Sequence, residues 1–273
     1  MSGKLFVVGT PIGNLGDFSP RAVEALENCD FIAAEDTRVT LKLLNRFEIK
    51  KPMVSYFEHN RFERGPVIVE RILAGEKCVL VTDAGMPAIS DPGEDLVRLC
   101  IEKGISIEAV PGPCAFATAL AVSGMPSRRF TFEGFLPTEK SARREHIDSL
   151  VDERRTMILY EAPHKLIQTL KDLLQSLGNR EIAIVRELTK IHEEVIRTTL
   201  FDAVERYSQE AIKGEIVLIV KGAEKAEKST MSLEQAAEYA KELVEKGESK
   251  TDAAKIAAKE SGYKKGEIYK LLI

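Results

Sequence analysis

The stretch KCVLVTDAGMPAISDPG, residues 77–93, decides the fold of the first half of this chain. It begins as a short apolar run and then breaks into a turn that holds two Gly, two Pro and two Asp. An apolar run of this length bounded by Gly and Pro is typical of a buried strand. GEDLVRLCIEKG (93–104) follows and has the periodicity of a helix. The stretch therefore predicts a strand, an elaborate loop and a helix.

The same alternation recurs through the first 124 residues. Ser19 and Pro20 predict a helix start, as an N-cap followed by a first-turn proline. Strands that alternate with helices imply a parallel and mostly buried sheet. The predicted strands lie in 4–8, 30–37, 52–57, 77–83 and 105–113, and the predicted helices are 19–29, 40–47, 65–76, 93–104 and 114–124.

The pattern changes after residue 125. Strands are predicted at 129–135, 156–160, 181–186, 194–200 and 215–220, with helices at 138–151 and 163–177. Residues 221–232 read as a polar linker, and a small helical tail follows. Within the tail, Ser249 is the expected N-cap and Gly262 the stop of a helix-turn-helix-like unit. We expect an α/β protein with a parallel-sheet domain (1–124), a second mixed α/β domain (125–222) and a helical C-terminal domain (232–273).

Composition narrows the class of protein. The chain has 273 residues, 44% of them apolar, and a formal net charge of -4, so no overall basic field indicates nucleic-acid binding. The four Cys and four His are scattered without zinc-type spacing, which predicts a reduced cytoplasmic protein without a metal site. No apolar run approaches the roughly 18 residues of a membrane span. We therefore expect no membrane partner.

Four strand ends carry the candidate chemistry. They are GTPIGNLGD (9–17), AEDTR (34–38), TDAGMPAISDPG (82–93) and PGPCA (111–115). In a parallel sheet such ends meet at one edge, where ligands bind. Gly lets a backbone approach a ligand and Pro stiffens the loop, so Gly85 and Pro87 are expected to shape a backbone-lined wall. The alternative is that such loops are simply rich in Gly and Pro.

The ligand can be narrowed by exclusion. The sequence lacks the G-x-G-x-x-G pattern of dinucleotide sites, the P-loop pattern and the G-x-S-x-G elbow of hydrolases. An adenosine-containing ligand without a pyrophosphate fits better, and S-adenosylmethionine is one such ligand. In the second domain, LYEAPHK (159–165) and RELTKIHEEV (186–195) place ionisable residues at strand ends, where they either face the same cleft or are surface charges.

Taken together, these segments resemble a known family. VGTPIGNLGDFSPRA, AEDTR, TDAGMPAISDPG, PGPCA, GFLP, YEAPHK and RELTKIHEE occur in this order over about residues 4–220. They are similar to the bacterial small-subunit ribosomal RNA (cytidine-2'-O)-methyltransferases, a branch of the tetrapyrrole methylase superfamily, or class III methyltransferases. The resemblance implies two α/β domains, S-adenosylmethionine in the cleft between them, a homodimer, and 16S rRNA in the 30S ribosomal subunit as the substrate, methylated at a cytidine of the decoding region.

The resemblance also implies cofactor contacts, many of them through backbone atoms. Carried over by motif, and together with Gly85 and Pro87, these are Pro11, Met86, Ile89, Cys114, Ala115, Tyr160 or Glu161, and Glu215. One position departs from the family pattern, because TDAGMP stands where SDAGTP is expected. Met86 removes a hydroxyl, so the loop must rely there on its backbone or on a sulfur contact.

Methyl transfer to a ribose hydroxyl requires positioning of the oxygen and removal of its proton. The acidic candidates for the proton transfer are Glu35, Asp36, Asp83, Glu161 and Glu187. We expect Glu187 and Lys190 to flank the target ribose, and Asp36 with Arg38 to order the RNA side of the pocket. Basic residues that we expect to contact RNA phosphates are Arg38, Arg128, Arg129, Lys140, Arg143 and Arg144, although a solvated helix face is the alternative for the last three.

Two other functions remain open at this point. One is methylation of a small tetrapyrrole by the same fold, which would need a wide apolar trough. The other is a non-catalytic ribosome-assembly factor that retains the cofactor site. The helical tail, with nearly balanced charge, is expected to dock on rRNA or protein or to pack within a dimer.

Overall fold

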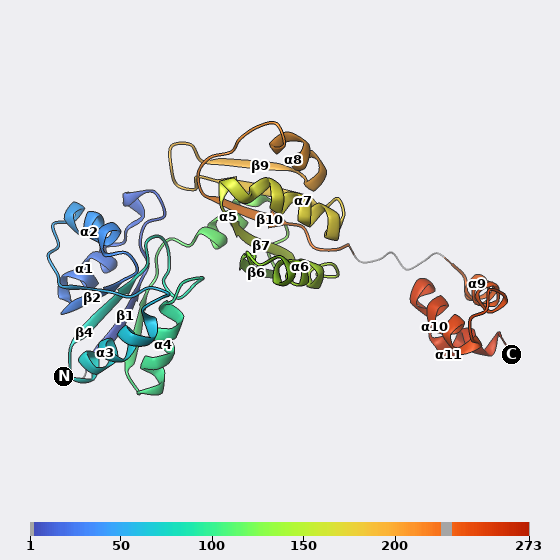
Figure 1. Ribbon diagram of the computed structural model, residues 1–273, viewed down its shortest axis with the longest axis horizontal. Helices are drawn as coiled ribbons and strands as arrows, with labels where there is room; N and C mark the ends of the chain where they lie inside the picture. Colours follow the sequence, from blue (N-terminus) through green and yellow to red (C-terminus); the bar gives the residue numbers. More distant parts are fainter. Residues whose placement is uncertain (1–2, 225–230, 273) are drawn as a thin grey trace. The chain divides into compact units, whose positions relative to one another are not determined.

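The computed structural model describes residues 3–224 and 231–272. The chain divides into two compact units, Met1–Ala223 and Glu224–Ile273, which are described separately (Figure 1). No helix in the described parts combines the length and the apolar character needed to cross a membrane.

The first sheet of the larger unit is parallel, as predicted. Its strand order is β3-β2-β4-β1-β5, from β1 (Lys4–Val8), β2 (Phe31–Ala34), β3 (Met53–Ser55), β4 (Lys77–Val81) and β5 (Ser106–Val110). Helices α1 (Pro20–Asn28) and α2 (Thr37–Arg46) bury apolar residues against one face. Helices α3 (Arg61–Leu73) and α4 (Gly93–Glu102) cover the other face. The carboxyl ends of β1, β4 and β5 therefore lie next to one another.

The start of α3 differs from the prediction. The helix was expected at 65–76, but it begins at Arg61 and contains Pro66. A proline disfavours helical backbone in the residue before it through a clash with that residue's Cβ. Gly65 has no Cβ, and one placed there would lie 2.9 Å from Cδ1 of Leu99. The Gly-Pro pair therefore fits inside this helix.

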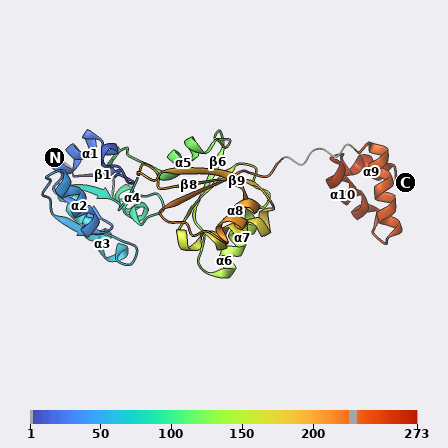
Figure 2. The same cartoon turned by 90° about the horizontal axis from the view of Figure 1, so that it is seen from above.

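The second sheet contains both parallel and antiparallel strand pairs. Its order is β6-β7-β10-β8-β9, from β6 (Phe130–Phe135), β7 (Thr156–Glu161), β8 (Glu181–Arg186), β9 (Glu194–Thr199) and β10 (Ile216–Val220), and only β6 and β7 pair in parallel. Helices α6 (Lys140–Ser149), α7 (Leu166–Leu177) and α8 (Leu200–Tyr207) cover one face. Helix α5 (Ala115–Ser123) lies on the opposite face (Figure 2).

Helix α5 joins the two sheets. It follows the last strand of the first sheet, but its buried residues Ala119 and Leu120 pack against β7, β8 and β10 of the second sheet. Gly124 ends the helix in the left-handed conformation, with φ 80°. The domain boundary at residue 124 stays a prediction, but α5 fixes the end of β5 to the second sheet.

The smaller unit contains α9 (Leu233–Glu245), α10 (Lys250–Ser261) and α11 (Lys265–Lys270). The Ser249 side chain accepts the N–H of Asp252, and Gly262 ends α10 at φ 78°, both as predicted. The core is built from small residues and one isoleucine: Ala236, Ala240, Ala253, Ala254, Ala257 and Ile268. Six residues of the predicted linker, 225–230, lie outside the described residues.

Candidate functional site

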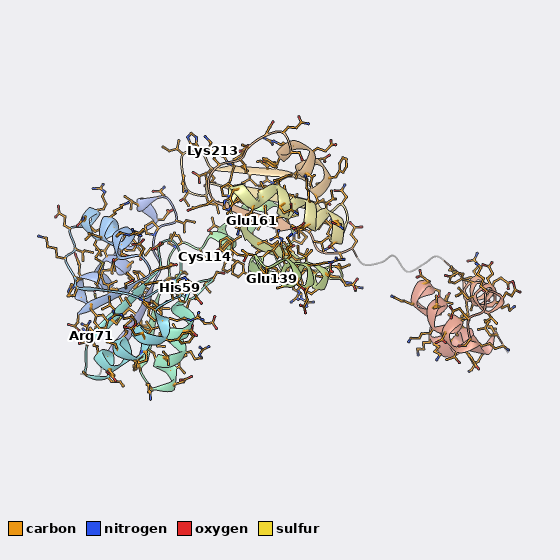
Figure 3. All side chains as sticks on the ribbon, in the orientation of Figure 1. His59, Arg71, Cys114, Glu139, Glu161 and Lys213 are labelled. Atoms are coloured by element: carbon orange, nitrogen blue, oxygen red, sulfur yellow. The ribbon has the colours of Figure 1, made fainter. Side chains whose placement is uncertain are left out.

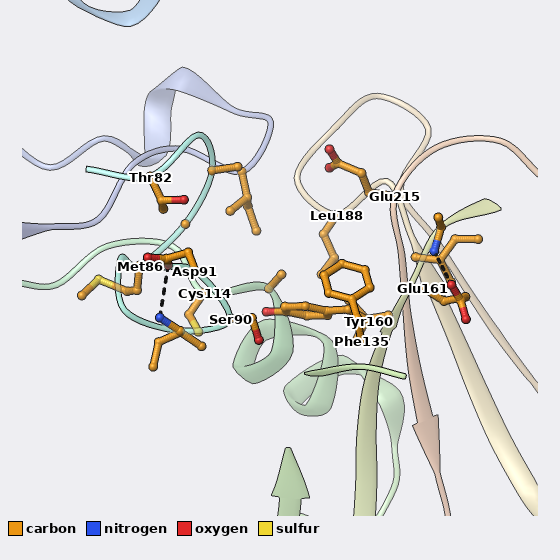
Figure 4. Close-up of a pocket in the computed structure, with 18 of the residues that line it drawn as sticks. Thr82, Met86, Ser90, Asp91, Cys114, Phe135, Tyr160, Glu161, Leu188 and Glu215 are labelled. Atoms are coloured by element: carbon orange, nitrogen blue, oxygen red, sulfur yellow. Dashed lines mark hydrogen bonds between the residues drawn. The ribbon is translucent and has the colours of Figure 1, made fainter. Parts of the chain in front are cut away.

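A cavity of about 370 Å³ lies where the loops after β1, β4 and β5 meet the second sheet (Figure 4). This volume is within the range of small-molecule sites. Cys114 and Glu161, labelled in Figure 3, both contribute to it from different parts of the chain. The lining consists of Ile12, Glu35, Thr82, Ala84, Gly85, Met86, Ile89, Ser90, Asp91, Cys114, Ala115, Phe135, Tyr160, Glu161, Ala162, Pro163, Val185, Leu188, Glu215, Ile216 and Val217.

Backbone pairing fixes the loop after β4 to the loop after β1. The N–H of Thr10 donates to the carbonyl of Gly85 at 2.9 Å, and the N–H of Gly85 donates back to Thr10 at 3.2 Å. The Thr10 hydroxyl also donates to the carbonyl of Thr82 at 3.2 Å. Gly85 has φ 93°, a conformation that residues with a Cβ rarely adopt. These hydrogen bonds therefore hold the two loops together as one wall of the cavity.

Met86 occupies a tight junction between three loops. A Cβ on Gly9 would lie 2.6 Å from Cα of Gly112 and 2.7 Å from Sδ of Met86, so only glycine fits there. The Gly112 N–H donates to the Met86 sulfur at 3.3 Å. The sulfur of Met86 is therefore in contact with the protein itself, and a contact between Met86 and a cofactor stays a prediction.

Asp91 organises the second half of the same loop. Its carboxylate accepts the backbone N–H groups of Ala88, Ile89 and Gly93 at 2.8–3.2 Å. Burial raises the pKa of Asp91, and the three N–H groups oppose that shift. Ala88 and Ser90 have positive φ values of 66° and 64°. Such strained residues cluster at ligand sites, where the surrounding structure holds them in place.

The opposite wall is aromatic. The rings of Phe135 and Tyr160 lie with centroids 5.4 Å apart, and both side chains border the cavity (Figure 4). The Tyr160 hydroxyl oxygen accepts the N–H of Phe116, in the first turn of α5, at 3.2 Å. Burial raises the pKa of Tyr160 to about 12, so the phenol stays protonated at neutral pH. Tyr160 thereby connects the second sheet to the turn after β5.

The charged residues of the lining are all acidic. They are Glu35, Asp91, Glu161 and Glu215, and no lysine, arginine or histidine lines the cavity within the described residues. The carboxylate of Glu161 is turned away from Tyr160 (Figure 4), because successive side chains of a strand point to opposite faces. It accepts the N–H of Ala162 at 2.8 Å and the hydroxyl of Thr169. Glu161 therefore borders the cavity through the atoms near its backbone.

The predicted cofactor residues are mostly brought together here. Pro11 and Pro87 do not line the cavity. Pro11 precedes the lining residue Ile12, and Pro87 is buried. The other predicted residues all line it: Gly85, Met86, Ile89, Cys114, Ala115, Tyr160, Glu161 and Glu215. Their contacts with a cofactor stay a prediction.

Glu187 and Lys190, expected to flank the ribose, and Asp36, expected on the RNA side of the pocket, do not line the cavity. Lys190 Nζ lies 2.8 Å from Oε1 of Glu187 and 3.2 Å from Oε2 of Glu215, a lining residue. The hydrogen bond from Lys190 lowers the pKa of Glu187. Glu187 and Thr189 have φ values of 52° and 66°, so the backbone of this loop is strained on both sides of Leu188. The loop places Leu188 in the cavity and Lys190 at its rim.

The third predicted catalytic residue, Asp36, caps α2. Its carboxylate accepts the N–H of Arg38 at 2.8 Å and forms an ion pair with the Arg38 guanidinium at 2.6 Å. These hydrogen bonds lower the pKa of Asp36 to about 2. A carboxylate held in this way is a weak proton acceptor. Arg38, one of the predicted RNA contacts, is therefore paired with Asp36.

The remaining predicted RNA contacts fall into two groups. Arg128, Arg129, Lys140 and Arg144 are exposed. Arg143 is different, because its Nε donates to Asp172 at 2.8 Å and its Nη2 donates to Thr169 at 2.7 Å. Arg143 is therefore bound between α6 and α7 and is not free to contact a phosphate.

Two of the acidic candidates for the proton transfer, Glu35 and Asp83, lie next to each other at this edge of the first sheet. Glu35 accepts the Thr82 hydroxyl at 2.5 Å and the N–H of Asp83 at 3.3 Å. Partial burial, followed by the charge of Glu35, raises the pKa of Asp83. The signal was present in the motifs at 34–38 and 82–93, which supply two acids to the same sheet edge. Phe135 and Leu188 line the cavity but were not among the predicted site residues. They lie in the motifs GFLP and RELTK, which are among the segments that carry the family resemblance.

Within the described residues, no cluster of His, Cys, Asp and Glu side chains has the geometry to hold a metal ion. The cysteine at the site, Cys114, is half-buried, and burial raises its pKa, so it is not a thiolate nucleophile at neutral pH.

Comparison with known proteins is consistent with this architecture. The family model of the Tetrapyrrole (Corrin/Porphyrin) Methylases matches residues 4–204. The methyltransferase CobJ superposes with a TM-score of 0.61 and 19% identity, covering 81% of this chain and 95% of its own. Uroporphyrin-III C-methyl transferase from Thermus thermophilus, in complex with S-adenyl homocysteine, superposes with a TM-score of 0.55 and 18% identity, covering 80% of this chain and 97% of its own. These superpositions establish the fold, and the predicted fold class is confirmed.

Relatives at higher identity resolve the branch. Ribosomal RNA small subunit methyltransferase I of Synechocystis sp. is 44% identical over 270 residues, which cover 98% of this chain and 97% of the relative. The protein of the same name from Thermotoga maritima is 46% identical over 222 residues, covering 81% of this chain and 100% of the relative. This chain belongs to the ribosomal RNA small subunit methyltransferase I family, within the tetrapyrrole methylases.

Proposed function

We propose that this protein transfers the methyl group of S-adenosylmethionine to the 2'-hydroxyl of a cytidine in the decoding region of 16S rRNA, with the assembled 30S subunit as substrate. The observation that carries the proposal is the lining of the cavity between the two sheets, which is apolar and acidic and contains no basic residue in the described chain. The printed names of the relatives support the rRNA substrate.

The chemistry of the lining suits this cofactor. S-adenosylmethionine carries an activated methyl group on a positively charged sulfur, together with an ammonium and a carboxylate. A negative, partly apolar wall favours such a net cation, whereas a phosphate-bearing cofactor would be repelled by the lining carboxylates of Glu35 and Asp91. The S-adenyl homocysteine complex of the Thermus relative supports the same cofactor.

The residues that would hold the cofactor come from both sheets. The Thr10–Gly85 pairing and the Asp91-bound turn present backbone groups from the first sheet. Ala115 and Tyr160 supply apolar surface from α5 and the second sheet. Since these groups are already fixed by hydrogen bonds within the protein, little ordering is required when the cofactor binds.

The rim residues then have distinct roles in the transfer. Attack by the ribose oxygen becomes easier as its proton is removed. Asp83, with its raised pKa, is a better proton acceptor than Asp36, whose pKa is about 2. Lys190, held by Glu187 and Glu215, flanks the ribose and stabilises negative charge on the attacking oxygen. In this proposal Glu187 positions Lys190.

Cofactor binding can be tested by filling the cavity. Ala115→Leu adds a branched side chain to the lining, whereas Ala117→Leu adds it to the exposed face of the same helix. We expect calorimetry to show binding of S-adenosylmethionine to the wild type and to Ala117→Leu, and no measurable binding to Ala115→Leu. Equal affinity in all three proteins would place the cofactor elsewhere. The homodimer stays a prediction and is checked by light scattering.

A further inference from the structure

A second cavity, of about 540 Å³, lies between α6 and α7. Four cationic residues contribute to its lining, Lys140, Arg143, Arg144 and Lys165, together with a single acid, Asp172. We call this cavity the α6–α7 groove. Its remaining lining residues are Pro137, Thr138, Ile147, Gln168, Gln175 and Ser176.

Only one of the four positive charges in the groove is paired with an acid of its lining. Asp172 is bound to Arg143 at 2.8 Å, and its other oxygen accepts the Gln168 amide at 2.7 Å. Lys140, Arg144 and Lys165 are exposed. Arg144 lies 3.6 Å from Asp148 in a pair whose side chains are 83% and 50% exposed. Such a surface pair contributes little energy and is easily exchanged for another anion.

The groove and the proposed cofactor cavity are lined by residues from the same two segments of the chain. In one segment Phe135 lines the cavity and Pro137 lines the groove. In the other, Pro163 lines the cavity and Lys165 lines the groove. Two residues span at most about 7 Å, so in each segment the Cα atom of a cavity residue lies within about 7 Å of that of a groove residue. This separation is about that of adjacent nucleotides in a single strand.

The floor of the groove is connected to the cavity wall. Arg143 donates to Thr169, whose hydroxyl donates to Glu161 at the cavity border. Thr169 is fully buried, so this chain of hydrogen bonds is shielded from solvent. It fixes the groove and the segment 161–163 relative to each other. A rigid spacing of this kind is required if a phosphate held in the groove is to set the position of a ribose in the cavity.

We propose that the α6–α7 groove binds the phosphodiester backbone of single-stranded RNA that flanks the methylated nucleotide, through Lys140, Arg144 and Lys165. This inference rests on the proposed function and names the part of the substrate that it holds. RNA bound as a single strand exposes both the ribose hydroxyl and the flanking phosphates. Arg143 acts as a positioning residue, not as a phosphate ligand.

The test is a charge-neutralised triple variant, Lys140→Gln/Arg144→Gln/Lys165→Gln. Its matched control neutralises two lysines and one arginine that are exposed and line neither cavity: Lys50→Gln/Lys103→Gln/Arg154→Gln. A second control, Lys140→Arg/Arg144→Lys/Lys165→Arg, keeps the charge of the groove. Binding to unmethylated 30S subunits is measured by filtration over a range of salt concentrations, and cofactor binding by calorimetry.

We expect the triple variant to bind 30S subunits about tenfold or more weakly, with a slope of log K against log salt reduced by about 2, because each lost contact with single-stranded RNA removes about 0.7 from the slope. Both controls keep wild-type binding, and all variants keep the cofactor affinity. Equal binding by the triple variant and the matched control overturns the inference, as does weaker binding with an unchanged slope. If the wild type binds no S-adenosylmethionine, that result contradicts the proposed function and not the groove. The binding of 30S subunits by the triple variant and its controls still tests the groove in that case.

Discussion

Gly13, in the loop after β1, lies directly against the side chain of Lys190, in the loop after β8. A Cβ at position 13 would lie 2.5 Å from Cγ of Lys190 and 2.9 Å from the hydroxyl of Thr189. The residues next to this contact, Ile12 and Leu188, both line the cavity. The absence of a side chain at Gly13 therefore lets the loops of the two sheets close over the site.

Replacement of Gly13 by alanine tests this closure. Gly13 has φ 150°, and the added Cβ must displace the Lys190 stem, which Glu187 and Glu215 hold. We expect Gly13→Ala to weaken the binding of S-adenosylmethionine about tenfold, equivalent to about 1.4 kcal/mol. Calorimetry measures the change. Gly16→Ala is the control, since its Cβ meets only the Asn14 side chain, and unchanged affinity in both variants would show that the closure is not required.

The Met86 sulfur offers a second test. Met86→Leu preserves the side-chain volume but removes the acceptor of the Gly112 N–H, which is bonded at 3.3 Å. We expect faster hydrogen exchange of the Gly112 amide, by about fivefold if the bond contributes about 1 kcal/mol. Met157→Leu, in the core of the second sheet, is the control. Identical protection of Gly112 in the two variants would mean that the sulfur contact carries no energy.

The bond between Thr169 and Glu161 predicts a stability difference. Thr169→Val removes a buried donor to a carboxylate, which costs about 1–3 kcal/mol. Thr156→Val removes a buried donor to the neutral carbonyl of Pro126, bonded at 2.6 Å, and should cost less. Urea denaturation compares the two free energies of unfolding. A smaller loss in Thr169→Val than in Thr156→Val would contradict the importance of the Arg143–Thr169–Glu161 chain.

The ion pair between Asp36 and Arg38 predicts that the stability of the fold depends on pH. Its pKa is lowered from 3.8 to about 2 by the hydrogen bonds of Arg38, so the ionised form stabilises the fold above about pH 4. That contribution is lost as the pH falls through about 2. Asp36→Asn keeps a helix-capping residue but cannot titrate. We expect the stability difference between wild type and Asp36→Asn to shrink from pH 4 to pH 2, whereas a constant difference would exclude this ion pair.

The proton acceptor is tested by single-turnover methylation. Asp83→Asn is expected to lower the rate at least about 100-fold, the usual contribution of a general base, without changing cofactor affinity. Since the pKa of Asp83 is raised, the wild-type rate should fall as the pH decreases toward that pKa. Glu187→Gln and Lys190→Ala measure the other rim residues in the same assay. A wild-type rate in Asp83→Asn would remove that carboxylate from the mechanism.

Much of the fold follows from the sequence because its signals are local. The apolar runs at 4–8 and 77–81 and the caps Ser19, Ser249 and Gly262 determine their elements with little help from tertiary contacts. The start of α3 was not predicted from the sequence. A helix can contain Pro66 here because the residue before it is Gly65, which also lies close to Leu99 of α4. Packing between distant segments overrides local propensity at such positions.

The candidate site divides in the same way. The loops that form the cavity were predictable, since the carboxyl ends of parallel strands converge. The direction of individual side chains was not, because it depends on strand register and partners. Glu161 turns to Thr169, and Arg143 is bound between Asp172 and Thr169 instead of being free for a phosphate. Sequence position alone does not distinguish Arg143 from its exposed neighbour Arg144.

Methyl transfer from labelled S-adenosylmethionine tests the proposed function most directly. The protein is incubated with unmethylated 30S subunits, free 16S rRNA or a corrin precursor, and labelled products are digested and identified by mass spectrometry. We predict label in 30S subunits alone, recovered as 2'-O-methylcytidine. Label in the corrin precursor, in another position of the nucleotide, or in none of the three substrates would contradict the proposal.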